Sequence, residues 1–215
     1  MDSGQVATRD EWLIARRELR ELEKEAARLR DLVNARRRRL PWVLLEKEYV
    51  FDGLRGKRTL VDLFDGRRQL VIYHFMAHAE GERFCAICSF NVDNIGHLAH
   101  LHARDTSLVV DCPVPVAEIE PFRRRMGWDV PWVSSRGSTF HDDLSFPVDV
   151  DSPEPTGPGV SAFIRDGDRV YHTYSTQGGS DLLNPTYTYL DITALGRQVA
   201  GMPDPTAWIR YHDEY

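Results

Sequence analysis

The chain has 215 residues, of which 42% are hydrophobic and 28% charged, and its formal net charge is −6 at pH 7. This balance is typical of globular proteins and argues against global disorder. With only 3 cysteines, a disulfide scaffold is excluded. Because no apolar run approaches about 18 residues, we expect no membrane span. The N-terminus lacks the pattern of a secretory signal, so we expect a cytoplasmic protein.

Residues 1–41 are predicted to form an N-terminal helical extension. Thr8 and Glu11 have the spacing of a capping box, and Pro41 ends the helix. Such a helix packs on a second copy of the chain, giving a homodimer, or on another surface. The basis is a heptad seam with spacings of 3 and 4, made of Trp12, Ala15, Leu19, Leu22, Ala26, Leu29 and Val33.

Four consecutive arginines, Arg36 to Arg39, close this helix. Clustered guanidinium groups can neutralise phosphates, but cations at a helix C-terminus also complement the helix dipole. Neither interleaved aromatic residues nor zinc-finger spacing accompanies the run. We therefore expect no nucleic-acid partner.

Residues 42–201 alternate between strand and helix patterns, which predicts an α/β domain, followed by a C-terminal tail at 202–215. The run Gln69 to Met76 is nearly continuous in apolar strand formers and indicates a central strand buried on both faces. The other predicted elements are short β pieces at Tyr49 to Phe51 and Thr59 to Val61, a helix from Cys85 to Leu101, a strand at Ser107 to Asp111, a helix at Val116 to Met126, loops at Trp128 to Ser138 and Asp149 to Gly159, a hairpin of Val160 to Arg165 with Arg169 to Tyr174, and a helix at Ile192 to Ala200.

Two of the three cysteines form a Cys-x-x-Cys pattern at the point where the central strand leads into a helix. Cys85 lies at the predicted helix N-terminus, where unpaired amides and the helix dipole favour a thiolate. Cys88 lies one turn further along, close enough to form a disulfide with it. Cys85 is therefore the predicted nucleophile and Cys88 the predicted resolving thiol.

The chain resembles the DUF899 family of thioredoxin-like, predicted dithiol–disulfide oxidoreductases, over nearly its whole length. This resemblance implies a thioredoxin-like α/β fold with a peroxiredoxin-type layout, a central mixed sheet flanked by helices. It implies a thiol redox role with a thiol or disulfide substrate and an external reductant. The motifs that carry it are Leu40-Pro41-Trp42-Val43, Tyr73-His74-Phe75-Met76, Cys88-Ser89-Phe90, Arg125-Met126-Gly127-Trp128, Pro131-Trp132-Val133-Ser134-Ser135, Phe163-Ile164-Arg165-Asp166-Gly167, His172-Thr173-Tyr174-Ser175 and Leu190-Asp191-Ile192-Thr193.

Zinc binding is a competing interpretation, because Cys85 and Cys88 supply half of a tetrahedral site. The nearby histidines, His97, His100 and His102, fall too far along the same predicted helix to complete it. His97 and His100 could still hold a metal together with Asp93, but such histidines more often form a partly exposed helix face. We therefore predict no metal and no cofactor.

Aromatic residues near the motif give the second alternative. Trp128, Trp132 and Tyr174 could line a substrate groove or fill the core. A non-catalytic thioredoxin-fold protein that binds a small apolar ligand or a protein partner would use such a groove without thiol chemistry. Cys112 is interpreted as a small buried hydrophobe, with a third redox role as the alternative.

Overall fold

The structure is a computed structural model that describes residues 4, 6–77, 84–144, 159–177 and 183–215. It divides into two compact units, Met1–Pro41 and Trp42–Tyr215. The first unit contains α1 (Arg9–Arg37). The elements of the second unit are β1 (Val43–Leu45), β2 (Val50–Gly53), β3 (Gly56–Thr59), α2 (Leu60–Leu63), β4 (Gln69–His74), α3 (Ala86–Asp93), α4 (Ala99–His102), β5 (Thr106–Cys112), α5 (Val116–Arg125), β6 (Trp132–Ser134), α6 (Phe140–Leu144), β7 (Gly159–Asp166), β8 (Arg169–Gln177), α8 (Pro185–Asp191) and the 3₁₀ turn η1 (His212–Glu214).

The predicted long N-terminal helix and its capping box are confirmed in α1. The Glu11 amide donates to the Thr8 hydroxyl at 3.3 Å, and the Glu11 carboxylate accepts the Thr8 amide at 2.7 Å. Each bond satisfies an amide that the first helical turn leaves without an intrahelical partner. A cap of this kind contributes about 1 kcal/mol to helix stability.

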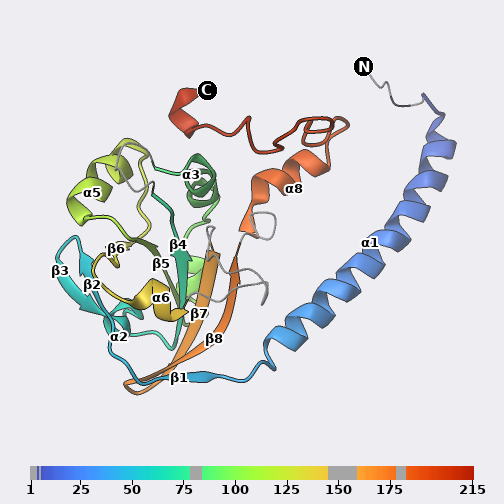
Figure 1. Ribbon diagram of the computed structural model, residues 1–215. Helices are drawn as coiled ribbons and strands as arrows, with labels where there is room; N and C mark the ends of the chain where they lie inside the picture. The colour runs from blue at the N-terminus through green and yellow to red at the C-terminus, as the bar shows by residue number, and fades with distance from the viewer. Residues whose placement is uncertain (1–3, 5, 78–83, 145–158, 178–182) are drawn as a thin grey trace. The chain divides into compact units, whose positions relative to one another are not determined.

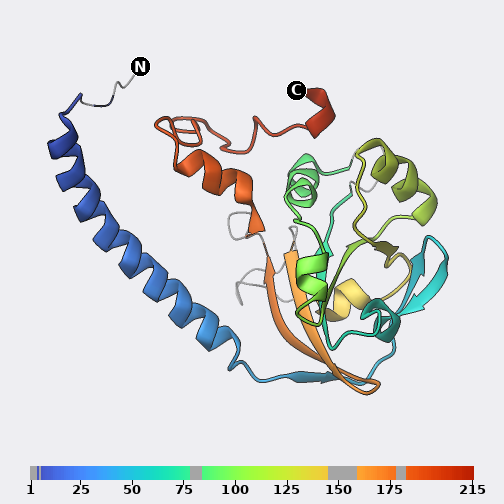
Figure 2. The same ribbon diagram turned by 180° about the vertical axis from the view of Figure 1, so that it is seen from behind.

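The second unit is built on one mixed sheet of 8 strands in the order β1-β8-β7-β4-β5-β6-β2-β3. β4 is central, as predicted, and pairs in parallel with β5 and antiparallel with β7. The α3–α4 segment connects β4 to β5, and the antiparallel hairpin β7–β8 leads into α8. Figure 1 shows the hairpin beside β4, and Figure 2 shows the same arrangement from behind.

A parallel β-α-β unit joined to an antiparallel β-β-α unit is the thioredoxin-like arrangement. The predicted fold class, α/β with a central mixed sheet flanked by helices, is therefore confirmed. No helix among the described residues has the length and apolarity needed to cross a membrane.

Successive residues of β4 face opposite sides of the sheet, so the two sides have separate cores. Tyr73 lies in the core under α3 and α5, together with Phe75 just beyond the strand. Leu70 and Ile72 lie in the other core, which is covered by α2 and α6. His74 points to this second side, since its ring contacts Phe140 of α6. We call these sides the Cys88 face and the Phe140 face.

Four predicted elements were wrong in detail. Of the strand piece predicted at Thr59 to Val61, only Thr59 lies in a strand, as the last residue of β3, because Thr59 and Asp62 form a capping box that begins α2. The helix predicted from Cys85 is interrupted between α3 and α4, where Asn94 caps the end of α3 by donating to the Phe90 carbonyl at 2.7 Å. Three residues of the predicted loop at Trp128 to Ser138 form β6, which pairs in parallel with β5.

The last helix was placed too late. Pro185 begins α8 in its first turn, where its missing N–H costs nothing, and the helix ends at Asp191. Residues 192–200 do not continue the helix, since Gly196 and Gln198 have positive φ angles of 58° and 55°, in the left-handed region. The loop predicted at Asp149 to Gly159 lies outside the described residues except for Gly159, which begins β7.

The C-terminal segment belongs to the second unit. Ile209 packs with Phe90 of α3 and Tyr187 of α8. Tyr211 lies in the Cys88-face core, where its ring contacts Phe122. Residues 202–215, predicted as a tail, therefore supply side chains to the buried clusters.

Candidate functional site

Cys85 is the N-cap residue of α3, as the sequence predicts. Its backbone is extended, with φ −66° and ψ 121°, and its sulfur accepts the amide of Cys88 at 3.3 Å. An N–H donor aimed at a sulfur from the first turn of a helix stabilises negative charge there. Cys85 as a residue is half-buried.

Cys88 lies one turn inward and is completely buried. Burial raises the pKa of its thiol strongly, and the neighbouring Cys85 adds to this effect. Two hydrogen bonds act in the opposite direction. The Met76 amide donates to the Cys88 sulfur at 3.4 Å, and the Tyr73 hydroxyl also donates to it. The two cysteines thus have different environments, one at the helix end and one in the core.

Tyr73 is a part of the site that sequence reasoning missed. Its ring is buried in the Cys88-face core and its hydroxyl also accepts the Asn91 side-chain amide at 3.0 Å. Asn91 in turn accepts the Asn184 side-chain amide at 3.3 Å. Burial raises the pKa of Tyr73, so the phenol stays protonated and acts as a donor to Cys88. The sequence signal was a lone tyrosine within the apolar run of β4.

Aromatic rings lie beside the dithiol. Phe84, directly before Cys85, stacks on Phe122 of α5 with centroids 4.3 Å apart, and the Tyr211 hydroxyl donates to the Phe84 carbonyl. Phe75 packs edge-on against Phe84. This packing fixes the backbone on which Cys85 begins the helix.

Two of the three predicted substrate-binding residues, Trp128 and Trp132, lie together, and Tyr174 lies on another element. Trp128 and Trp132 are 7% and 4% exposed and stack on each other in the Cys88-face core, with centroids 5.5 Å apart. The Trp128 indole N–H donates to the Asp93 carboxylate at 2.7 Å. Tyr174 lies on β8 opposite Ala162 of β7. The two tryptophans thus lie in the same buried core as Cys88, and Tyr174 lies on a different strand.

Cys112 ends β5 on the same face as Cys88 and is completely buried. Burial, with a contribution from the Asp111 carboxylate, raises the pKa of its thiol to about 12. A buried, protonated thiol is inert, which agrees with its interpretation as a small hydrophobe.

The histidines named in the zinc alternative do not gather around the cysteines. Among the described residues, the only cluster of three or more metal-ligating side chains with converging ligand atoms is His74, Asp111 and His141. These come from β4, β5 and α6 on the Phe140 face. Sequence reasoning missed this cluster, because its members lie far apart along the chain.

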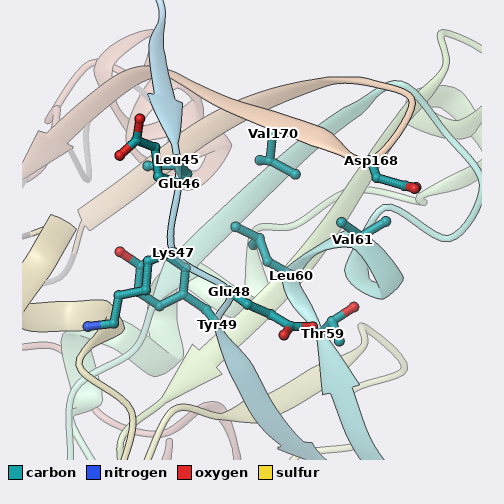
Figure 3. Close-up of a pocket in the computed structure, with 10 residues that line it drawn as sticks. All are labelled: Leu45, Glu46, Lys47, Glu48, Tyr49, Thr59, Leu60, Val61, Asp168 and Val170. Carbon is teal, nitrogen blue, oxygen red and sulfur yellow. The ribbon is translucent and has the colours of Figure 1, made fainter.

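A pocket lies at the opposite end of the sheet from the cysteines, near the β7–β8 turn (Figure 3). Leu60 and Val170 form its apolar floor, while charged side chains surround its rim. None of its lining residues is a cysteine or a histidine. They are Leu45, Glu46, Lys47, Glu48, Tyr49, Thr59, Leu60, Val61, Asp168 and Val170.

Comparison with solved structures gives matches at low identity. Peroxidoxin BcpB from Mycobacterium tuberculosis is 18% identical with a TM-score of 0.46, covering 64% of this chain and 84% of its own. A secreted Mycobacterium tuberculosis disulfide oxidoreductase is 12% identical with a TM-score of 0.40, covering 66% and 96%. An uncharacterized conserved protein from Geobacillus kaustophilus is 12% identical with a TM-score of 0.46, covering 64% and 69%.

No curated protein matches the sequence. A family model does match it, described as a bacterial protein of unknown function, DUF899, and the match runs over residues 1–215. This agrees with the resemblance that the sequence motifs indicate. The chain belongs to the DUF899 family.

Proposed function

We propose that this protein is a thiol–disulfide oxidoreductase that works through Cys85 and Cys88. One observation carries the proposal. The half-buried Cys85 caps a helix, and the fully buried Cys88 lies one turn further along, where its backbone amide donates to the Cys85 sulfur. A protein that used this region only as a scaffold would have no need for two thiols at a helix N-terminus.

The reaction begins at Cys85. Its thiolate attacks one sulfur of a substrate disulfide, which forms a mixed disulfide and releases one substrate thiolate. Cys88 then attacks the Cys85 sulfur, its proton passing to the released thiolate. This step releases the second substrate sulfur as a thiolate, which takes its proton from water, and leaves a Cys85–Cys88 disulfide. The substrate has gained two electrons, and an external thiol reductant returns the protein to its dithiol form.

The environment of Cys88 suits it to the second step. Its high pKa keeps it protonated, and therefore a poor nucleophile, towards molecules in solution. The Met76 amide and the Tyr73 hydroxyl are already placed to stabilise the thiolate when the mixed disulfide forms beside it. We assign Tyr73 as a positioning residue.

The remaining parts of the proposal concern substrate and setting. Trp128 and Trp132 would support the substrate surface from beneath, and Tyr174 would contribute from β8. A reducing cytoplasm would supply the thiol reductant. The heptad seam of α1 would join two copies in a homodimer, which sedimentation equilibrium of the full chain against a Leu19→Lys/Leu22→Lys variant would test.

The experiment is disulfide trapping with single-cysteine variants. Wild-type protein, Cys85→Ser and Cys88→Ser are mixed with a disulfide substrate such as insulin, and products are identified by non-reducing mass spectrometry. Cys88→Ser should accumulate a mixed disulfide at Cys85, because the resolving thiol is gone. Cys85→Ser should form none and should not reduce insulin. Cys112→Ser is the matched control and should behave as wild type.

Two outcomes would overturn the assignment. Mixed disulfides that form equally at Cys88 or Cys112 would show that Cys85 is not the nucleophile. Insulin reduction that survives in Cys85→Ser would show that the dithiol is not the source of electrons.

A further inference from the structure

The cluster on the Phe140 face is assembled by the sheet itself. His74 and Asp111 are direct partners in the parallel β4–β5 ladder, so both side chains leave the carboxyl ends of adjacent strands on the same side. His141 comes from α6, where the neighbouring Phe140 is completely buried against this face of the sheet. Three potential ligands thus meet from three separate elements.

Their atoms converge within 4.8 Å of one another. His141 Nε2 lies 2.7 Å from Asp111 Oδ2, and His74 Nδ1 lies 4.0 Å from the same oxygen. For comparison, the ligand atoms of a tetrahedral ion with bonds of about 2.0–2.2 Å lie about 3.3 Å apart. The two separations from Asp111 Oδ2 therefore differ from that of a bound ion by less than about 1 Å, which side-chain rotation can supply.

Asp111 is the most informative member. Its side chain is completely buried, its Oδ2 lies at ion-pair distance from His141 Nε2, and its Oδ1 has no hydrogen-bond partner among the described residues. His74 Nδ1 is also buried without a hydrogen-bond partner among these residues. Buried carboxylates are costly unless charge or hydrogen bonds compensate them, and a cation between these atoms would do so.

The far side of the His74 ring is already fixed. Its Nε2 lies 2.8 Å from the Ser161 hydroxyl, which bonds to Ser175 at 2.7 Å, and Ser175 bonds to His172 Nε2 at 2.8 Å. A proton on Nε2 leaves the lone pair of Nδ1 directed towards Asp111. Metal-binding histidines characteristically have such a hydrogen bond on their second ring nitrogen.

We propose that His74, Asp111 and His141 bind one divalent transition-metal ion, for which zinc is the test case. Two imidazole nitrogens and one carboxylate suit zinc or ferrous iron, whereas calcium and magnesium prefer oxygen ligands alone. Three protein ligands leave a coordination position for water or a small ligand. Of the three side chains, that of His141 is the most exposed, at 33%.

This site is separate from the dithiol. Tyr73, which donates to Cys88, and His74 are consecutive residues of β4 and so project to opposite faces. A metal ion at His74 would therefore have none of the three cysteines among its ligands. The competing explanation is that Asp111 and His141 form only an ion pair, in which case no metal is needed.

The experiment uses the full chain without a histidine tag, stripped of metal with a chelator and kept reduced. Zinc is titrated by calorimetry, and cobalt(II) serves as a spectroscopic probe of the ligands. The wild type should bind one equivalent of zinc. Its cobalt spectrum should show d–d bands without thiolate-to-cobalt charge transfer, since the ligands are nitrogen and oxygen.

Two variants test the ligands. His141→Gln changes a partly exposed residue of a short helix, and Asp111→Asn keeps the shape of the buried side chain. Each should weaken zinc binding by more than about 10-fold, the lower bound for losing even an outer-shell partner. Circular dichroism checks that each variant is folded, and the wild-type titration remains decisive if Asp111→Asn is not.

Matched controls separate this site from the alternatives. His97→Gln/His100→Gln removes two other histidines, and Cys85→Ser/Cys88→Ser removes the dithiol; both should bind zinc as the wild type does. Loss of binding in the cysteine variant, thiolate charge transfer with cobalt, or no wild-type binding would each overturn the proposal. Unchanged affinity in His141→Gln would do the same.

Discussion

The two faces of the central sheet carry different chemistry on the same two strands. On one face, the Tyr73 hydroxyl donates to Cys88, and Cys112 lies in the same buried core. On the other, His74 and Asp111 place an imidazole and a carboxylate in a site that is also largely buried. The alternation of a β-strand therefore lets adjacent residues serve separate sites with no shared side chain.

The faces also differ in how they are built. The dithiol is local, because one strand–helix junction places Cys85 and Cys88 a single turn apart. The histidine–aspartate cluster depends on the register of two strands and on α6 packing over them. A change in packing on the Phe140 face should therefore disrupt the cluster and leave the dithiol intact.

The largest effect is expected from Phe140→Ala. Phe140 is completely buried and contacts Tyr49, Phe51 and Phe163, so its removal should cost about 3–5 kcal/mol of unfolding free energy. It should also weaken zinc binding, because α6 loses its anchor. Urea unfolding and zinc titration measure the two effects.

Phe75→Ala is the control from the Cys88 face. Phe75 is 1% exposed, so the stability loss should be similar, but zinc affinity should be unchanged. Equal losses of zinc affinity in both variants would contradict the separation of the two faces.

Alkaline pH should destabilise the folded protein by less than the Phe140→Ala or Phe75→Ala substitution does. The pKa of Cys112 is raised to about 12 in the folded protein, whereas an unfolded thiol titrates near 8.5. The contribution of Cys112 to the free energy of unfolding is fully present below pH 8.5. It is lost as pH rises towards 12, since in this range only the unfolded state releases the thiol proton. At pH 10 the loss is about 2 kcal/mol for this one thiol.

Urea unfolding at pH 7 and pH 10 measures this loss, and Cys112→Ala provides the comparison. The variant should lose about 2 kcal/mol less than the wild type between the two pH values. An identical pH dependence in both proteins would show that Cys112 is not held protonated by the fold.

The smallest effect is expected from Tyr73→Phe. Losing the hydroxyl that bonds to Cys88 and Asn91 should cost about 1 kcal/mol of stability. Because that hydroxyl lowers the pKa of Cys88, its loss should also slow the resolving step. Acid-quench alkylation should then detect a longer-lived mixed disulfide at Cys85 in Tyr73→Phe, with Tyr189→Phe, a change at an exposed residue of α8, as the control. A lifetime equal to that of the wild type would remove Tyr73 from the mechanism.

Local signals made much of the fold and the dithiol predictable. The apolar run of β4 favoured a buried central strand, and the Cys-x-x-Cys spacing placed Cys85 and Cys88 correctly at the start of α3. The hairpin β7–β8 followed from Asp166-Gly167, whose glycine adopts φ 61°. In each case the residues that decide the structure are neighbours in the chain.

Features set by distant residues were not predictable. His74 and Asp111 meet only because β4 and β5 pair in one register, and His141 joins them through a five-residue helix without strong periodicity. Likewise, β6 has three residues and exists because it pairs with β5 and β2. Tyr73 resembled any core aromatic residue until its hydroxyl was seen beside Cys88.

The central claim is that Cys85 and Cys88 form a reversible redox pair. The most direct measurement equilibrates the purified, reduced protein in glutathione buffers over a range of redox potentials, then counts free thiols by alkylation and mass spectrometry. A single two-electron transition confined to Cys85 and Cys88, with Cys112 reduced until the protein is unfolded, is the predicted result. Three thiols that remain reduced at every potential, or oxidation that pairs Cys112, would contradict it.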